Sequence, residues 1–134
     1  MEVPADIQRI LEDRKSGSIA LLNDLIKALE QELGEGRLSP GTFLDQITHI
    51  GTKLSHFAAI ENFLIGLRDS LKGPNGEAGD ALEYITGYRR YWQDSPEKMA
   101  GNLLASVRVE GATLLTHSHS ETIQSVLKVL KKRD

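Results

Sequence analysis

Most of the chain alternates between apolar and polar positions with a helical period. Apolar residues recur at intervals of three and four, which places them on one side of successive helices. The pattern predicts a short opening helix after Pro4 and a second helix from Ile19 to Leu33, closed by Gly34 and Gly36. These segments have the apolar faces that a helical bundle requires.

The longest apolar stripe covers residues 40–71 and predicts a single long helix. Ser39 supplies an N-cap and Pro40 occupies the first helical position. Gly51 and Gly66 interrupt the interior, where each glycine costs about 1 kcal/mol relative to alanine. We therefore expect each glycine to mark a close helix contact or a bend, and one of them to coincide with a kink.

Two further helices are predicted before the pattern changes. Residues 81–92 have the spacing of a fourth amphipathic helix, and Ser95 followed by Pro96 is the signal that restarts a fifth. The buried face of this fifth helix is expected to consist of Met99, Leu103 and Val107.

Residues 112–116 are the one good strand candidate. They form a short continuous apolar run after Gly111, which is typical of a buried strand. Ser118 and Glu121 then form a capping box that leads into a last, amphipathic helix. The fold class expected is mainly α, with a helical bundle over residues 1–109 and one strand-helix unit over residues 110–134.

A lone buried strand would leave backbone groups unpaired at both edges. Each such group costs about 1–3 kcal/mol when it is desolvated without a partner. A strand followed by a polar loop and a helix normally opens a parallel α/β unit that continues to a second strand. We therefore expect residues 110–134 to begin a domain that is missing here or is supplied by another chain.

Composition narrows the function classes. The chain has 134 residues, with 16 Lys and Arg, 19 Asp and Glu, a net charge of -3 and no Cys. Thiol chemistry, disulfides and zinc thiolate sites are excluded. No apolar run approaches the roughly 20 residues of a membrane span, so we expect a cytoplasmic protein with no membrane partner. The mild acidity and the 5% aromatic content also argue against direct binding of nucleic acid.

The first candidate site is the turn between the predicted strand and the last helix. Thr116, His117, Ser118 and Ser120 would place hydroxyls and free backbone amides around an anion such as a phosphate. The simpler alternative is that Ser118 only caps the helix. His117 and His119 lack further ligands with suitable spacing, so no metal site is expected, and the sequence indicates no cofactor.

The second candidate site precedes the second helix. Arg14, Ser16, Gly17 and Ser18 combine a cation with small hydroxyl residues at a helix start, a pattern that is suited to anions. Here too a plain N-cap, supplied by Ser16 or Ser18, is an alternative.

The stretch GATLLTHSHSETIQSVLKVL resembles a segment of the translation initiation factor 2B alpha/beta/delta family. The resemblance rests on Gly111, Leu115, Thr116, His117, Ser118 and Ser120. Residues 13–18 also resemble an early anion-contacting segment of that family, and residues 56–62 resemble its middle helix. The family includes methylthioribose-1-phosphate and ribose-1,5-bisphosphate isomerases, in which an N-terminal helical domain precedes a Rossmann-like domain. The resemblance implies that residues 110–134 are the first unit of that second domain.

The departures from the family pattern bear on catalysis. In the isomerases a cysteine follows the Thr-His pair, whereas this chain has Ser118, and a serine hydroxyl does not easily replace an acidic thiol. The family's catalytic aspartate would lie beyond residue 134. The resemblance therefore implies a non-catalytic binding or assembly module that forms homo- or hetero-oligomers through its exposed strand and helix faces and takes a sugar phosphate or nucleotide phosphate. The alternative is the N-terminal part of a sugar-phosphate aldose-ketose isomerase.

Overall fold

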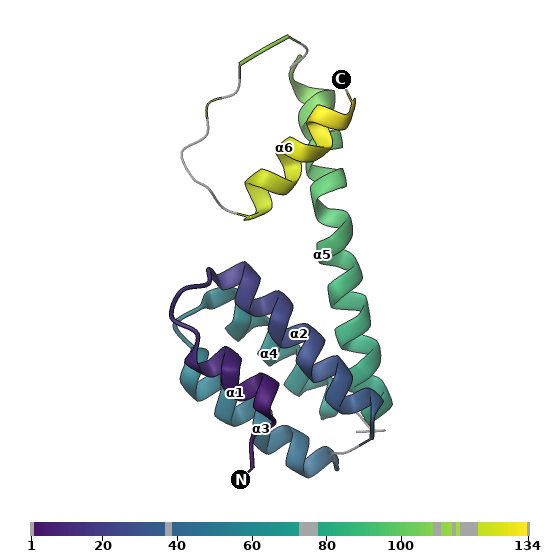
Figure 1. Ribbon diagram of the computed structural model, residues 1–134. Helices are drawn as coiled ribbons and strands as arrows, with labels where there is room; N and C mark the ends of the chain where they lie inside the picture. The colour runs from purple at the N-terminus through teal and green to yellow at the C-terminus, as the bar shows by residue number, and fades with distance from the viewer. Residues whose placement is uncertain are drawn as a thin grey trace. The chain divides into compact units, whose positions relative to one another are not determined.

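The computed structural model describes residues 2–36, 39–72, 78–108, 111–113, 115 and 121–133 (Figure 1). Within these residues all regular secondary structure is helical. The helices are α1 (Ala5–Glu12), α2 (Ser18–Gly34), α3 (Pro40–Leu54), α4 (Ala58–Leu71), α5 (Ala78–Ser106) and α6 (Glu121–Arg133). The chain forms two compact units, and the boundary between them falls within α5: unit 1 is Met1–Arg89 and unit 2 is Arg90–Asp134.

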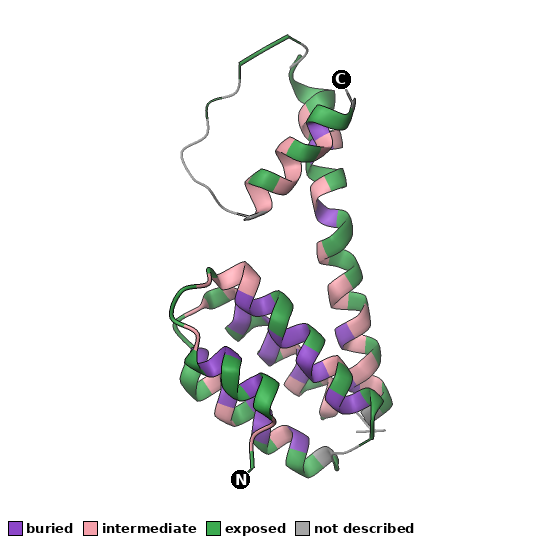
Figure 2. Cartoon of the chain, viewed as in Figure 1, coloured by how far each residue is buried: buried purple, intermediate pink, exposed green. Residues whose placement is uncertain are grey.

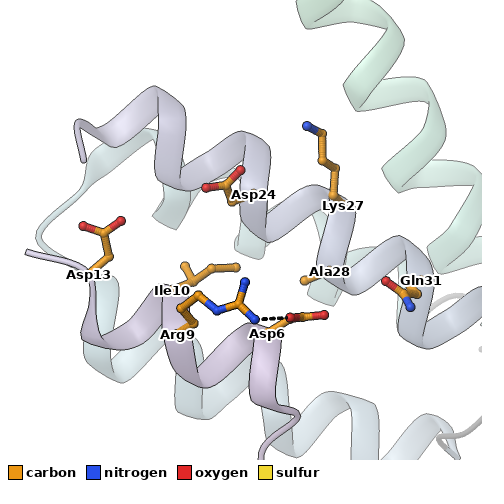
Figure 3. A pocket seen from close by; sticks show the side chains of 8 residues that line it. All are labelled: Asp6, Arg9, Ile10, Asp13, Asp24, Lys27, Ala28 and Gln31. Carbon is orange, nitrogen blue, oxygen red and sulfur yellow. Dashed lines mark hydrogen bonds and ion pairs between the residues drawn. The ribbon is translucent and has the colours of Figure 1, made fainter. Parts of the chain in front are cut away.

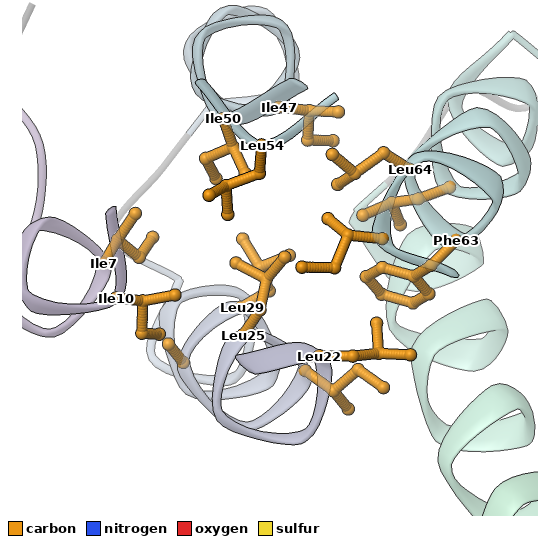
Figure 4. Packing of buried hydrophobic residues seen from close by; sticks show 14 of the residues in the cluster. Ile7, Ile10, Leu22, Leu25, Leu29, Ile47, Ile50, Leu54, Phe63 and Leu64 are labelled. Carbon is orange, nitrogen blue, oxygen red and sulfur yellow. The ribbon is translucent and has the colours of Figure 1, made fainter. Parts of the chain in front are cut away.

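The core of unit 1 is built by the apolar stripes that the sequence predicts. Helix α1 packs on α2 and α3, and α4 also packs on α2 and α3. Their buried side chains point toward one another, and the labelled ones in Figure 4 are Ile7, Ile10, Leu22, Leu25, Leu29, Ile47, Ile50, Leu54, Phe63 and Leu64. Figure 2 shows the buried residues of α1–α4 on the helix sides that face this core. The predicted helical bundle is present in this unit.

The predicted strand-helix unit is wrong. Ala112, Thr113 and Leu115 have no regular structure, and Leu115 is 99% exposed, whereas a buried strand would hide it. Gly111 has a φ of 68° and lies in a turn. The physical reason is pairing: a strand is stable only beside another strand, and the described part of the chain forms none. Leu114 and Thr116 lie outside the described residues.

The single long helix predicted over residues 40–71 is two helices. Helix α3 ends at Leu54, and α4 begins after Phe57, whose backbone is extended (φ -97°, ψ 103°). The break lets α3 and α4 fold against each other, so that Leu54 and Ile60 on either side of it are both almost fully buried. The glycines do not mark the break, because both helices continue through Gly51 and Gly66.

The fourth and fifth predicted helices are one helix, α5, with Pro96 in its interior. A proline there removes one backbone hydrogen bond and crowds the preceding turn, at a cost of about 3 kcal/mol. Ser95 and Ala100, on either side of the proline, are both buried, and the helix continues through it. The expected inward face is wrong at two positions, since Met99 is 41% and Val107 is 53% exposed. The domain boundary at residues 109 and 110 falls outside the described residues and stays a prediction.

Candidate functional site

The loop between α1 and α2 is organised by the carboxylate of Asp13. Its Oδ1 accepts hydrogen bonds from the backbone amides of Lys15 at 2.8 Å and Ser16 at 2.9 Å, and its Oδ2 accepts from the Ser16 hydroxyl at 2.6 Å. These bonds lower the pKa of Asp13 from 3.8 to about 2, with the Ser16 hydroxyl as the main cause and the two amides next. Asp13 is therefore ionised in the folded protein and fixes the backbone that leads into α2.

Several donors that the sequence predicts to bind an anion already make hydrogen bonds within this loop. The hydroxyl and amide of Ser16 are both engaged, and Nη1 of Arg14 donates to the backbone carbonyls of Leu11 at 2.9 Å and Asp13 at 3.4 Å. Gly17 is the N-cap of α2, and no side chain accepts a hydrogen bond at that cap. The alternative in which Ser16 or Ser18 caps the helix is thus not what the structure shows.

The structure brings Arg14, Ser16, Gly17 and Ser18 together in one short segment at the start of α2. Gly17 and Arg14 are exposed, and Ser18 and Ser16 are partly buried. The other four predicted site residues, Thr116, His117, Ser118 and Ser120, lie outside the described residues, so the relation between the two candidate sites stays a prediction.

A shallow groove of about 330 Å³ lies between α1 and α2 (Figure 3). Buried Ile10 and Ala28 lie at its base, and Asp13 lines it at the loop end. Arg9 is already paired with Asp6 at 2.8 Å. The remaining lining residues are Asp24, Lys27 and Gln31. Three carboxylates against two cations make this groove a poor receptor for a phosphate, whose charge they would repel.

A second groove, of about 360 Å³, lies between α3 and α4. Each helix contributes four residues at positions i, i+3, i+4 and i+7, which share one helix face. They are Thr48, Gly51 and Thr52 from α3 with its C-cap residue Ser55, and Glu61, Leu64, Ile65 and Arg68 from α4. The single helix predicted over residues 40–71 leaves no place for this groove, although the spacing of small and hydroxyl residues around Gly51 is a signal for it.

Comparisons of the chain with protein-family models, curated proteins and solved structures gave no match. The resemblance to the initiation factor 2B family therefore stays a prediction. Among the described residues, no helix has both the length and the apolar character needed to cross a membrane. In the same part of the chain, no three His, Cys, Asp or Glu side chains are grouped so that they could hold a metal ion.

Proposed function

We propose that this chain is a non-catalytic binding and assembly module that takes the phosphate of a small sugar or nucleotide phosphate at the start of α2. The observation that carries the proposal is the uncapped first turn of α2, where Gly17 leaves the amide end of a 17-residue helix without a side-chain acceptor. Such an end attracts anions through its free N–H groups and its dipole. Exposed Arg14 lies three residues before Gly17 and adds a cation.

The test is a titration of the ¹⁵N-labelled protein with ribose 5-phosphate, followed through the amides of Gly17, Ser18 and Ile19. We expect saturable shifts at these amides, and a weaker affinity in Arg14→Gln. Arg9→Gln is the matched control, because Arg9 is an exposed arginine of α1 that is paired with Asp6. Equal shifts with unphosphorylated ribose would contradict the proposal. Turnover of ribose 1,5-bisphosphate would instead favour the isomerase alternative.

A second observation favours the assembly part of the proposal. Of the large hydrophobic side chains exposed in the described residues, all but Ile65 belong to unit 2: Tyr91, Met99, Leu104, Val107 and Leu115. By sequence, unit 2 has seven Lys and Arg against five Asp and Glu, whereas unit 1 has nine against fourteen. By sequence the net charge is therefore +2 for unit 2 and -5 for unit 1, and opposite charges favour contact between unit 2 of one copy and unit 1 of another. A second copy of the chain, with unit 2 of each copy on unit 1 of the other, is thus the partner we propose.

Sedimentation velocity over a range of protein concentrations tests this assembly. We expect a species of twice the 14.8 kDa chain mass that dissociates on dilution and in high salt. Val107→Asp should shift the equilibrium toward the monomer. A monomer at all concentrations would contradict the proposal.

A further inference from the structure

The groove between α3 and α4 holds an arginine without a partner. The Nε of Arg68 is buried and has no hydrogen-bond partner, and no ion pair or hydrogen bond joins the Arg68 side chain to the described residues. Its Nη2 lies 3.8 Å from the position that a Cβ at residue 51 would occupy, so the guanidinium lies over Gly51 of α3. Because protein atoms cover the Nε, the guanidinium can meet a molecule in the groove only through its Nη groups, which have no partner among the described residues.

The polar groups across the groove from Arg68 are mainly acceptors. The Thr48 hydroxyl donates to the Leu44 carbonyl at 2.9 Å, and the Thr52 hydroxyl donates to the Thr48 carbonyl at 3.0 Å. Each hydroxyl has one proton, so their oxygens can only accept from a molecule in the groove. Ser55, whose hydroxyl has no partner in the described residues, can donate or accept.

The two charges of the groove belong to the same helix and are separated along it. Glu61 and Arg68 are seven residues apart, which is about 10 Å along the axis of α4, and they form no ion pair with each other. Leu64 and Ile65 lie between them in sequence and give the groove an apolar part. The lining therefore offers one cation, one carboxylate, hydroxyl acceptors and an apolar surface, with no net charge.

We propose that this groove binds a small zwitterionic amino acid with an apolar side chain. The carboxylate of the ligand pairs with the guanidinium of Arg68, whose planar N–H groups match a carboxylate in a two-point interaction. Its ammonium donates to the hydroxyl oxygens of Thr48 and Thr52, and its side chain lies against Leu64 and Ile65. A phosphate fits less well, because its second negative charge finds no second cation in the lining. This site is separate from the phosphate site proposed at the start of α2.

Three probes of nearly the same shape separate these contributions: L-valine, L-valinamide without the carboxylate, and 3-methylbutanoate without the ammonium. We would follow the Nε–Hε signal of Arg68 in ¹⁵N-labelled full-length protein, with sodium chloride as the ionic-strength control. We expect saturable binding of L-valine in the millimolar range, and at least about tenfold weaker binding of the other two probes. Equal responses to the three probes, or no saturation with L-valine, would overturn the proposal.

Variants assign the effect to the groove. Arg68→Lys should weaken L-valine binding at least about tenfold, because an ammonium cannot reproduce the two-point contact. Arg90→Lys, at an exposed arginine of α5, is the matched control and should bind as the original chain does. Thr52→Val changes an exposed position and should weaken L-valine but not 3-methylbutanoate, so the test survives if Arg68→Lys fails to fold. Unchanged L-valine binding in Thr52→Val and Arg68→Lys would refute the assignment.

Discussion

The ring of Tyr84 on α5 lies directly against Gly66 on α4. A Cβ at residue 66 would overlap the Tyr84 hydroxyl oxygen and would be 2.7 Å from the ring carbon that carries it. The same hydroxyl donates to the backbone carbonyl of Phe63 at 3.0 Å, one turn earlier on α4. The sequence predicts a close helix contact or a bend at Gly66, and the close contact is confirmed.

Gly66→Ala should destabilise unit 1 by about 1–3 kcal/mol, because the methyl group and the Tyr84 ring cannot occupy the same space. The loss is expected even though alanine is the better helix former. Gly87→Ala on α5 is the control: nothing lies within 4 Å of the added methyl group, so this variant should gain up to about 1 kcal/mol. Urea unfolding of the two variants measures the difference, and equal stabilities would contradict the contact.

Tyr84 should make stability depend on alkaline pH. Burial, with smaller contributions from Tyr88 and Asp69, raises the pKa of Tyr84 from 10.0 to about 12. The folded state thus favours the protonated phenol. Its stabilising contribution is complete below pH 10 and is lost as the pH rises from 10 through 12. Urea unfolding of the original chain and Tyr84→Phe at a series of pH values should show the steeper decline in the original chain. Parallel curves would contradict this.

Asp13 should have the opposite effect at acid pH. Its folded pKa of about 2 lies below the unfolded value of 3.8, so its stabilising contribution is present above pH 3.8 and is lost as the pH falls toward 2. Asp13→Asn should lower stability near neutral pH and flatten the acid limb of the unfolding profile. Asp24→Asn is the control variant, because Asp24 is an exposed aspartate of α2 that makes no hydrogen bond within the described residues. A carboxyl ¹³C titration of Asp13 with a midpoint near 4 would argue against the hydrogen-bonded loop.

Glu30 on α2 and Arg89 on α5 form an ion pair across unit 1, with Nη1 of Arg89 2.6 Å from Oε2 of Glu30. The side chains are 25% and 39% exposed, so solvent screens the pair and its coupling should be about 0.3–1 kcal/mol. A double-mutant cycle with Glu30→Gln and Arg89→Gln measures the coupling. It should shrink in 1 M salt. A coupling near zero at low salt would show that the pair adds nothing to stability.

Apolar spacing in the sequence predicts the buried faces well. Leu22, Ile26, Leu29 and Leu33 are all buried as the stripe requires. The stripe cannot locate the break at residues 55–57, because Leu54, Phe57 and Ile60 keep an apolar spacing across it whether the chain is straight or folded back. The opposite error occurs at Pro96: the sequence predicts a new helix there because proline favours a first turn, whereas α5 continues through it.

For the candidate sites, the sequence identifies residue types but not how their hydrogen bonds are used. Arg14 and Ser16 look available for an anion, yet Asp13 and backbone carbonyls engage them locally. An aspartate often accepts from the backbone amide two residues on, as Asp13 does from Lys15, so Asp13 itself was a local turn signal. Arg68 lines the groove only because residues 55–57 fold α4 back against α3. The sequence alone does not show that its guanidinium lies close to Gly51.

The short connections in unit 1 also have a kinetic consequence. Residues 13–17 join α1 to α2, and residues 55–57 join α3 to α4, so each packed pair is a hairpin of sequence neighbours. Closing such loops costs little chain entropy. Much of the core is then assembled from contacts that are local in sequence, which places unit 1 among the low-contact-order helical proteins that fold in microseconds to milliseconds.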